Sequence, residues 1–484
     1  MPKAPIAIVS QVIRVLWGNR SDWRLVRPTM PGMPQLGSHW VGPVFAIASI
    51  GVGWYAFKDA RGDGAVGFAL FIGSVSILLM AWSNLLATRI APLEQLFGGL
   101  DRMYRWHRWF GALSVGAMWL HIQTVDDVKG IRGASEDVAD AAEDLAGTGS
   151  NLLYVLVAVS LLRWLPTRWW RWSHKFLVLP FAFASWHFYT ATKPYANDSL
   201  WGTWFAAFMV LGLWAWVYRV VWRDVVRRGR QYQVSNISTL GDAVELVLEP
   251  VGEPLRYKVG QFVFLKFGVR GMSEPHPFTI ASSPDEPVLR FFIKNLGDWS
   301  EAMGHRIQIG ARVKIEGPYG GLPILPERSA SEILWIAGGV GITPFLGAAC
   351  SRKPDDGPVP HLFYCVRTRQ DAVALTELEQ ASREGRIVLH VHASAEGQRL
   401  RSDDIAAVAG PDALVNTHVV MCGPDGLVKS MRTAVRSLGA RHIHVEGFDI
   451  RTGIGPDLSR TLHNAMTSQM RARVARRRED SIRV

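Results

Sequence analysis

Four histidines stand in pairs within two apolar stretches of the chain. His107 and His121 are fourteen positions apart in one stretch, and His174 and His187 are thirteen apart in another. On a helix each pair is separated by about 20 Å along the axis. Ionisable side chains inside a membrane are costly and usually functional. Because two helices running in the same direction present imidazoles at two matched depths, these residues are predicted to ligate two stacked haems, with two histidines for each iron.

This interpretation has an alternative and a geometric difficulty. A single histidine in a membrane more often forms a hydrogen bond between helices, although four at paired depths make that explanation the weaker one. Thirteen residues also leave a rotational mismatch of about 140° on a straight helix. Pro180 lies between His174 and His187, and proline can kink or re-phase a helix. The haem prediction therefore relies on Pro180 to correct the phase.

The second half of the chain carries a glycine-rich turn and three further motifs. The turn is Gly338-Gly339-Val340-Gly341-Ile342-Thr343-Pro344 and follows an apolar run. At a helix start, such a turn offers backbone N–H groups and a favourable dipole to a pyrophosphate. The other motifs are His276-Pro277-Phe278-Thr279 followed by Ile280-Ala281-Ser282-Ser283-Pro284, then Met421-Cys422-Gly423-Pro424, then Val445-Glu446-Gly447-Phe448.

The four histidines belong to a part of the chain with six apolar stretches. These cover residues 40–57, 65–87, 104–124, 151–165, 175–192 and 200–222, and a helix needs about 20 residues to cross about 30 Å of hydrocarbon. Arginine is concentrated before the first stretch and after the second, fourth and sixth, whereas the acidic loop 126–144 follows the third. By the positive-inside rule, we expect six spans with both termini in the cytoplasm.

Composition supports a membrane part followed by a soluble part. Eighteen of the 20 tryptophans lie between Trp17 and Trp222, and tryptophan is favoured at membrane interfaces. The 53 basic and 42 acidic residues give a net charge of +11, with the basic residues mainly between apolar runs, which favours a membrane surface over nucleic acid. The three cysteines, Cys350, Cys365 and Cys422, have no CxxC spacing. This excludes a disulfide scaffold and argues against an iron–sulfur cluster.

From about residue 231 the pattern changes to short alternating runs separated by Gly and Pro. The runs at 232–237, 244–249, 262–267, 288–294 and 313–316 predict a small antiparallel barrel. From about 332, apolar runs at 333–337, 362–366, 387–392 and 418–421 alternate with helical stretches. That alternation predicts an open parallel sheet with helices on both faces.

The order and spacing of the motifs resemble the ferredoxin-NADP reductase type of flavoprotein module. Joined to a six-span segment with paired histidines, the chain resembles the NADPH oxidase and ferric reductase superfamily of transmembrane flavocytochromes b over about residues 40–450. The resemblance implies a multi-domain fold. Its parts would be an interfacial segment at 1–39, a six-helix transmembrane haem domain at 40–230, an FAD-binding β-barrel at 231–330, an NAD(P)-binding α/β domain at 331–450 and a basic, disordered tail at 451–484.

The resemblance also implies roles for residues at matching positions. His276 to Thr279 would hold FAD, with Thr279 near the reactive nitrogen; soluble relatives carry arginine at the place of His276. Cys422 would lie near the hydride carbon and Phe448 would cover the flavin, although either is also explained as a buried packing residue. The other implied cofactor contacts are Pro277, Phe278, Lys294, Gly297, Trp299, Ser300, Gly317, Tyr319, Gly338, Gly339, Gly341, Thr343, Pro344, Gly423 and Pro424.

Arg367 and Arg369 decide the expected nicotinamide cofactor. They follow the second predicted parallel strand, where an arginine can accept the 2′-phosphate of NADPH and an acidic residue would favour NADH. We therefore expect NADPH, with NADH as the alternative.

The implied activity is electron transfer across the membrane. Cytoplasmic NADPH would reduce FAD, and the two haems would deliver electrons to a small acceptor outside, either oxygen or a ferric or cupric chelate. The alternatives are an electron-donor subunit for a separate protein and a haem-binding scaffold without turnover. Membrane lipid is the expected environment, no nucleic acid is expected, and nothing in the sequence indicates a protein partner.

Overall fold

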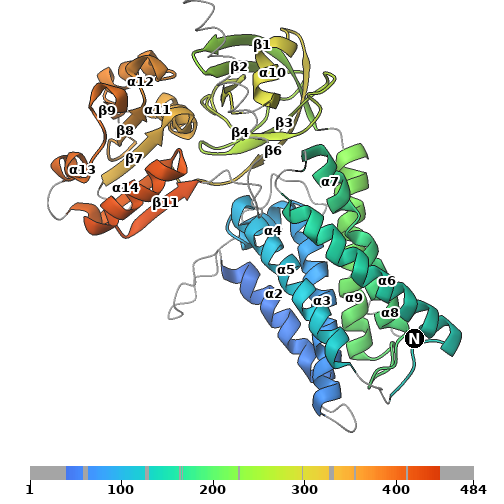
Figure 1. Cartoon of the computed structure of the whole chain (residues 1–484). Coiled ribbons are helices and arrows are strands. Elements are labelled where there is room, and N and C mark those ends of the chain that lie inside the picture. The colour runs from blue at the N-terminus through green and yellow to red at the C-terminus, as the bar shows by residue number, and fades with distance from the viewer. Residues whose placement is uncertain are drawn as a thin grey trace, which may run out of the picture.

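The computed structural model describes residues 40–57, 64–125, 130–162, 165, 167–226, 229–296, 298–325, 332–353, 356–409 and 413–446. The expected interfacial segment 1–39 and the basic tail 451–484 therefore lie outside the described residues. What is described comprises a helical bundle, an antiparallel sheet and a parallel sheet, in that order along the chain (Figure 1).

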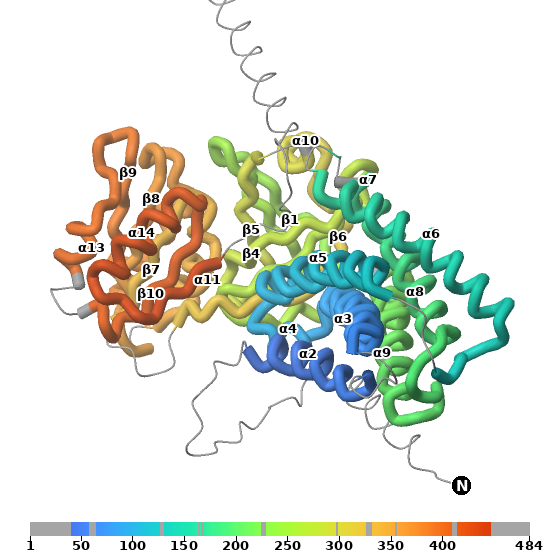
Figure 2. Tube along the Cα trace, turned by 60° about the horizontal axis from the view of Figure 1, so that its bottom comes forward, coloured from blue at the N-terminus to red at the C-terminus, as the bar shows by residue number. Residues whose placement is uncertain are grey.

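The helical bundle is built from long apolar helices with short connections. Its members are α2 (Val41–Val52, extended by the turn η2, Gly53–Ala56), α3 (Gly64–Ala87), α4 (Ala91–Leu96), α5 (Leu100–Thr124), α6 (Glu136–Leu161), α7 (Thr167–Lys175), α8 (Val178–Thr190) and α9 (Leu200–Val217), which continues as the π-helix η3 (Tyr218–Val226). Figure 2 shows α3 between α2, α5 and α9.

Aromatic and small side chains fill the interior of the bundle, while its outside is also apolar. Phe110, Phe181 and Phe205 are almost completely buried, whereas large side chains such as Trp109 and Val210 on the same helices are exposed. Apolar side chains on the outside of apolar helices have no favourable contact with water, and a lipid environment requires such a surface.

The six apolar stretches fall on helices, but only part of the predicted six-span pattern is visible. Within the described residues, three helices are long and apolar enough to cross a membrane, at Gly64–Ala87, Glu136–Leu161 and Leu200–Arg223. The segment Val41–Ala56 is apolar but shorter. Helix α5 has 25 residues and a charged first half, and α8 has 13. These helices are what a membrane segment requires, and six crossings remain a prediction.

The prediction of an acidic loop at 126–144 is wrong from residue 136 onward. Helix α6 begins at Glu136, so that the acidic residues up to Asp144 form its first turns. Ser135 occupies the N-cap position, and Glu136 and Asp137 lie in the first turn, where negative charge interacts favourably with the helix dipole. Polar composition suggested a loop, but these side chains lie on an exposed helix. Residues 126–129 lie outside the described part.

The fifth apolar stretch is broken between two helices. Helix α7 ends at Lys175 and α8 starts at Val178. Between them, Phe176 and Leu177 donate their N–H groups three residues back, to Ser173 and His174, which is tighter than an α-helical turn. The break comes just before Pro180, which lies in the first turn of α8, where proline is tolerated because the N–H it lacks would have no partner inside the helix.

The antiparallel sheet follows the bundle and curls toward a barrel. Its strands are β1 (Arg230–Leu240), β2 (Ala243–Pro250), β3 (Phe262–Phe267), β4 (His276–Thr279), β5 (Leu289–Lys294) and β6 (Arg312–Tyr319), in the order β4-β3-β6-β1-β2-β5. Helix α10 (Asp298–Arg306) follows β5. Ala281 N–H donates to the Arg290 carbonyl at 2.8 Å, which links the chain after β4 to the opposite edge strand. All five predicted runs are strands, and β4 is an additional one.

The last sheet is parallel and flanked by helices. Its strands are β7 (Glu332–Gly338), β8 (His361–Val366), β9 (Val388–Ala393), β10 (Thr417–Cys422) and β11 (His442–Glu446), in the order β11-β10-β7-β8-β9. The helices are α11 (Thr343–Ser351), α12 (Leu375–Arg383), α13 (Ser402–Ala409) and α14 (Asp425–Ser437). The strand order reverses between β7 and β10, and such sheets bind ligands at the carboxyl ends of strands at this point. β11 is a strand that the sequence pattern does not predict.

Candidate functional site

The histidines predicted to share a depth lie together. His107 on α5 and His174 on α7 have ring centroids 5.9 Å apart. His121 on α5 and His187 on α8 are close enough to interact electrostatically. The break between α7 and α8 lets two successive helices turn their histidines toward the same helix, α5. The structure thus brings together both predicted pairs.

Hydrogen bonds at Nδ1 orient both α5 histidines. His107 Nδ1 lies 2.8 Å from the Ser83 carbonyl oxygen, and His121 Nδ1 lies 2.9 Å from that of Ala69. A carbonyl oxygen can only accept, so Nδ1 carries the proton in both rings and Nε2 keeps its lone pair. This is the tautomer that can ligate a metal through Nε2.

The same tautomer follows for His174. Ser160 Oγ donates its proton to the Leu156 carbonyl at 2.7 Å, so at 3.1 Å it accepts from His174 Nδ1. The indole of Trp170 stacks on the His174 ring, with centroids 5.1 Å apart. Ring orientation and proton position are therefore both determined by neighbouring residues.

These surroundings fit a haem iron between each pair. Metal-binding histidines usually donate their second nitrogen to a carbonyl or a similar group, as three of these four do. A side chain at Gly73 would place its Cβ 2.7 Å from His121 Nδ1, so glycine makes room for that ring. Nδ1 of His187 is buried without a hydrogen-bond partner. In the described part of the chain no group of three or more His, Cys, Asp or Glu could hold a metal ion, and a haem iron with two histidines needs no such group.

The barrel motif His276–Thr279 forms strand β4 and packs against Trp299. The His276 and Trp299 ring centroids are 4.1 Å apart, and Phe278 stacks on Trp299 at 5.7 Å. Three buried polar atoms here have no hydrogen-bond partner: His276 Nε2, Thr279 Oγ1 and Trp299 Nε1. Because unpaired buried polar atoms are costly, they mark the place for a polar ligand, and the residues present fit FAD.

His276 is neutral at physiological pH in this setting. Burial, followed by the nearby Arg171 guanidinium of α7, lowers its pKa to about 4. A neutral imidazole can donate or accept a hydrogen bond, whereas an arginine at this position could only donate.

The predicted phosphate segment lies at the start of α10. Ser300 Oγ accepts the Leu296 N–H at 2.9 Å, and Lys294 forms an ion pair with Asp242 at 3.0 Å. Lys294 is therefore held by a carboxylate that a phosphate would have to displace. Gly297 lies outside the described residues.

Tyr319, one of the implied cofactor contacts, lies against the helical bundle. Its hydroxyl is hydrogen-bonded to Arg223 of η3 and donates to Glu316 at 2.9 Å. Gly317 and Gly320 both have positive φ, and a Cβ on Gly320 would lie 3.9 Å from Glu446 Oε1. The motif thus borders the parallel sheet through Gly320 and the membrane helices through Tyr319. Sequence spacing gave no signal for the second contact.

The glycine-rich turn lies against the Cys422 motif at the carboxyl ends of β7 and β10. A Cβ at Gly341 would lie 2.4 Å from the Cys422 carbonyl oxygen, and one at Gly338 would lie 2.7 Å from Pro424. Gly339 and Gly423 have positive φ. Thr343 is buried and begins α11, with Pro344 in its first turn. The predicted nicotinamide-binding residues are therefore brought together at the strand-order reversal.

Glu446 is a site residue that the predicted set leaves out. It is the register partner of Cys422 on the neighbouring strand, and its Oε2 is buried without a hydrogen bond. Burial, with Asp101 of α5 adding to it, raises the pKa of Glu446 to about 8. Burial and the adjacent Glu446 also raise the pKa of the Cys422 thiol well above its usual value. A single acidic residue before the aromatic Phe448 was the available sequence signal; Phe448 itself lies outside the described residues.

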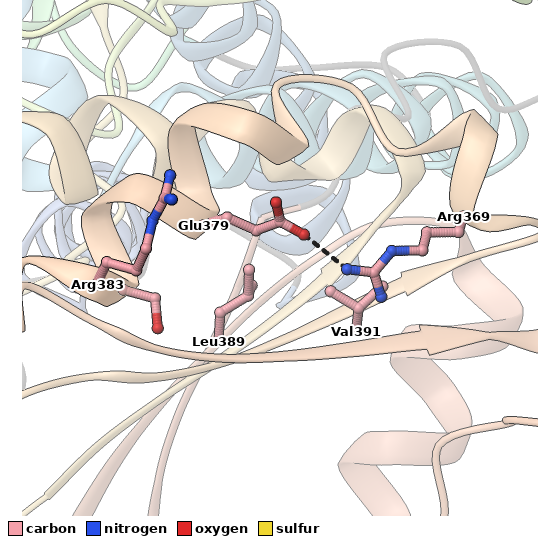
Figure 3. Close-up of a pocket in the computed structure, with 6 residues that line it drawn as sticks. Arg369, Glu379, Arg383, Leu389 and Val391 are labelled. Carbon is pink, nitrogen blue, oxygen red and sulfur yellow. Dashed lines mark hydrogen bonds and ion pairs between the residues drawn. The ribbon is translucent and has the colours of Figure 1, made fainter.

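Arg367 and Arg369 lie at the carboxyl end of β8, as expected. Arg369 forms an ion pair with Glu379 of α12 at 2.6 Å, above Leu389 and Val391 (Figure 3). These residues line a cavity of about 400 Å³, and Arg369 also lines a neighbouring one of about 470 Å³. Arg367 is exposed. Arg367 is thus accessible to a phosphate, whereas Arg369 would first have to leave Glu379.

Comparison with known families agrees with this arrangement. Residues 72–185 match the ferric reductase like transmembrane component, 228–322 an FAD-binding domain, and 335–433 an oxidoreductase NAD-binding domain. The Escherichia coli (strain K12) carnitine monooxygenase reductase subunit is 28% identical, over 46% of this chain and 70% of its own length.

Two plant oxidases are also similar to part of this chain. In Arabidopsis thaliana, ferric reduction oxidase 8 is 34% identical over 27% of this chain, and respiratory burst oxidase homolog protein E is 30% identical over 25%. The chain spans 20% and 15% of their lengths. The three family matches identify a transmembrane oxidoreductase with FAD-binding and NAD-binding domains, and together with these relatives they support the NADPH oxidase and ferric reductase superfamily.

Proposed function

We propose that the chain passes electrons from cytoplasmic NADPH, through FAD and two bis-histidine b-type haems, to an acceptor on the other side of the membrane. The observation that carries this proposal is the pairing of His107 with His174, whose ring centroids are 5.9 Å apart. The second pair, His121 and His187, supports a second haem deeper in the membrane.

Different residues of the flavin and nicotinamide module would bind FAD and NADPH. When bound, FAD supplies the chemistry that converts a hydride into single electrons. His276, Thr279 and Trp299 would hold the flavin through their unpaired polar atoms. The turn at Gly338–Pro344 would bind the pyrophosphate of NADPH, and Arg367 its 2′-phosphate. Cys422 and Glu446 would border the nicotinamide ring, with Glu446 able to hold or release a proton.

A six-span topology with cytoplasmic termini fits the charges. Arginine lies at the bundle end next to the barrel, including Arg89 and Arg223, whereas the acidic start of α6, at Glu136, follows the other end of α5. The positive-inside rule then places the barrel and the parallel sheet in the cytoplasm.

The acceptor is the open part of the proposal. Two histidines held to each haem iron would leave no site for oxygen to bind there, so the acceptor would receive electrons by outer-sphere transfer. Oxygen would yield superoxide, and a ferric or cupric chelate would yield the reduced metal.

NADPH consumption by the purified, FAD-loaded protein tests the proposal, with superoxide and ferrous iron measured in parallel. We expect haem absorbance, oxidation of NADPH, and one of the two products. Faster turnover with NADH would contradict the NADPH assignment. A protein without haem absorbance would refute the haem path. Flavin reduction with neither product would indicate an electron-donor subunit, and the absence of any NADPH oxidation would indicate a haem scaffold.

A further inference from the structure

The backbone of Arg89 adopts a conformation that its residue type disfavours. Helix α3 ends at Ala87, and Arg89 follows with a φ of 56°. Helices often end on such a left-handed residue, but it is usually glycine or asparagine. For arginine this conformation is costly and persists only where the surroundings determine it. The side chain must therefore make contacts that hold it in place.

The Arg89 side chain joins the bundle to the barrel. Nη1 lies 3.3 Å from Glu316 Oε1 of strand β6, and Nε donates to Tyr104 Oη of α5 at 2.6 Å. The guanidinium also lies over the Phe264 ring of β3, 3.9 Å from its centroid. The side chain is 10% exposed, so solvent screens these contacts little.

A second arginine reaches the same carboxylate from another helix. Arg223 of η3 places Nε 3.1 Å from Glu316 Oε1, and its side chain is 5% exposed. Its Nη1 donates to the Arg89 carbonyl at 3.0 Å and also to that of Thr88, while Nη2 donates to Tyr319 Oη. The residue that follows α3 by two positions, Arg89, and Arg223 of η3 therefore both reach one acidic group of strand β6, Glu316.

Glu316 is ionised in this setting. Burial alone would raise its pKa, but Arg89 and then Arg223 outweigh it and bring the pKa to about 2. One carboxylate thus pairs with two guanidiniums. Removing its charge would leave both arginines without their common partner, which is strongly unfavourable for buried groups.

A separate contact holds the end of the same strand. Glu94 of α4 is 9% exposed, and its Oε1 accepts the Gly320 N–H at 2.8 Å. Because Gly320 directly follows β6, both ends of this short segment, Glu316 and Gly320, are attached to the bundle. In Figure 1 the β6 side of the antiparallel sheet faces the end of the bundle where α4 lies.

The contacts lead directly to the proposed inner haem ligand. Tyr104, which receives the Arg89 hydrogen bond, has its ring 6.2 Å from that of His107. Ser83, whose carbonyl accepts from His107, belongs to α3, the helix that ends next to Arg89. The barrel is thus fastened to the two helices that orient His107.

We propose that Glu316, which is ion-paired with Arg89 and Arg223, is a positioning residue. It would set the distance and orientation between the flavin in the barrel and the inner haem. This rests on the proposed function, because it assigns FAD to the barrel and haem to His107 and His174. Electron transfer falls steeply with distance, so a small displacement of β6 would slow the step from flavin to inner haem. The residues assigned to NADPH, the turn Gly338–Pro344 and Cys422, are not among the contacts of Glu316, which are with Arg89, Arg223 and Tyr319. We therefore expect hydride transfer from NADPH to FAD to depend little on Glu316.

Anaerobic stopped-flow measurements on the full, cofactor-loaded chain test the proposal. In Glu316→Gln, we expect flavin reduction by NADPH within twofold of the parent and haem reduction at least tenfold slower. Glu316→Asp, which keeps the charge, should recover part of the rate. Glu249→Gln, the same chemical change at an exposed position of β2, is the matched control and should leave both rates unchanged. Haem reduction within twofold of the parent in Glu316→Gln would overturn the proposal.

Hydrogen exchange provides a second readout that needs no haem. The Gly320 amide, which donates to Glu94, should exchange faster in Glu316→Gln than in the parent or in Glu249→Gln. Unchanged exchange would contradict the proposal that Glu316 holds β6 against the bundle. If the parent protein binds no haem, the proposed function fails. Hydrogen exchange at Gly320 then still tests whether Glu316 holds β6 against the bundle. If Glu316→Gln does not fold, Arg89→Lys takes its place, since lysine keeps the charge but loses the forked geometry. The same slowing of haem reduction, or faster Gly320 exchange, is expected there.

Discussion

Arg290 and Glu377 form a two-point ion pair between the antiparallel sheet and α12, a helix that flanks the parallel sheet. Arg290 Nη1 and Nη2 of β5 lie 2.6 and 2.8 Å from the two carboxylate oxygens of Glu377 on α12. Arg290 Nε also contacts Glu245 of β2 at 2.5 Å. The barrel is thus fastened by arginine–carboxylate pairs on two sides, to the bundle through Glu316 and to the helix beside the nicotinamide-binding sheet through Arg290.

Arg290→Lys is expected to affect the opposite step from Glu316→Gln. Lysine keeps one charge but cannot bind both oxygens of Glu377 and also reach Glu245. We expect flavin reduction by NADPH to slow several-fold, with the subsequent haem reduction unchanged, in the same stopped-flow experiment. Equal slowing of both steps would mean that the pair only stabilises the fold.

Each histidine pair is expected to hold one haem, which should be lost when either member of the pair is replaced. Replacing either His107 or His174 by alanine should remove the same one of two haem signals in the absorption and electron paramagnetic resonance spectra. Replacing His121 or His187 should remove the other and abolish reduction across the membrane while flavin reduction by NADPH persists. Retention of both haems in His121→Ala would contradict the ligand assignment.

Ser160→Ala should weaken the inner site without removing a ligand. The Ser160 hydroxyl accepts from His174 Nδ1, and loss of such a partner typically lowers metal affinity by about 10- to 100-fold. We expect reduced haem occupancy and a raised reduction potential for one haem, measured by spectroelectrochemical titration. Ser150→Ala on the same helix, where Oγ contacts only the Gly147 carbonyl, is the control and should match the parent.

Glu446 should make the fold less stable as pH rises. Its pKa of about 8 lies above the ordinary value of 4.5, so the folded state binds the proton more tightly than the unfolded state. The stabilisation is complete below about pH 4.5 and is lost as pH rises through about 8. Thermal unfolding across this range should show Glu446→Gln gaining stability relative to the parent with rising pH. A constant difference between the two would contradict the buried, protonated state of Glu446.

Gly341→Ala should damage nicotinamide binding selectively. Its Cβ would lie 2.4 Å from the Cys422 carbonyl oxygen, so the turn would have to move away from β10. We expect at least a tenfold increase in KM for NADPH, with FAD content unchanged. Gly426→Ala on α14 has open space around its Cβ and should leave KM near the parent value. A KM for NADPH close to that of the parent in Gly341→Ala would show that the turn does not carry the cofactor.

The sequence alone determined the features that depend on residues close together along the chain. The alternating runs predicted the strands of the barrel, and the strand–turn–helix pattern at Gly338–Pro344 predicted the nucleotide turn, because both follow from local backbone preference and periodicity. The placement of His107 and His121 on one helix, α5, likewise followed from the sequence pattern. The acidic start of α6 was misread as a loop because exposed helix turns and loops share a polar composition.

Only the tertiary structure decided which groups meet. The break before Pro180 made the His174 and His187 pairings possible, and no spacing rule gives the angle of such a break. Glu446 became a buried acid, and Glu316 became the partner of Arg89 and Arg223, because segments up to about 230 positions apart were packed together. Burial and charge pairing are properties of that packing, since the cost of removing a charge from water depends on what surrounds it and not on its place in the chain.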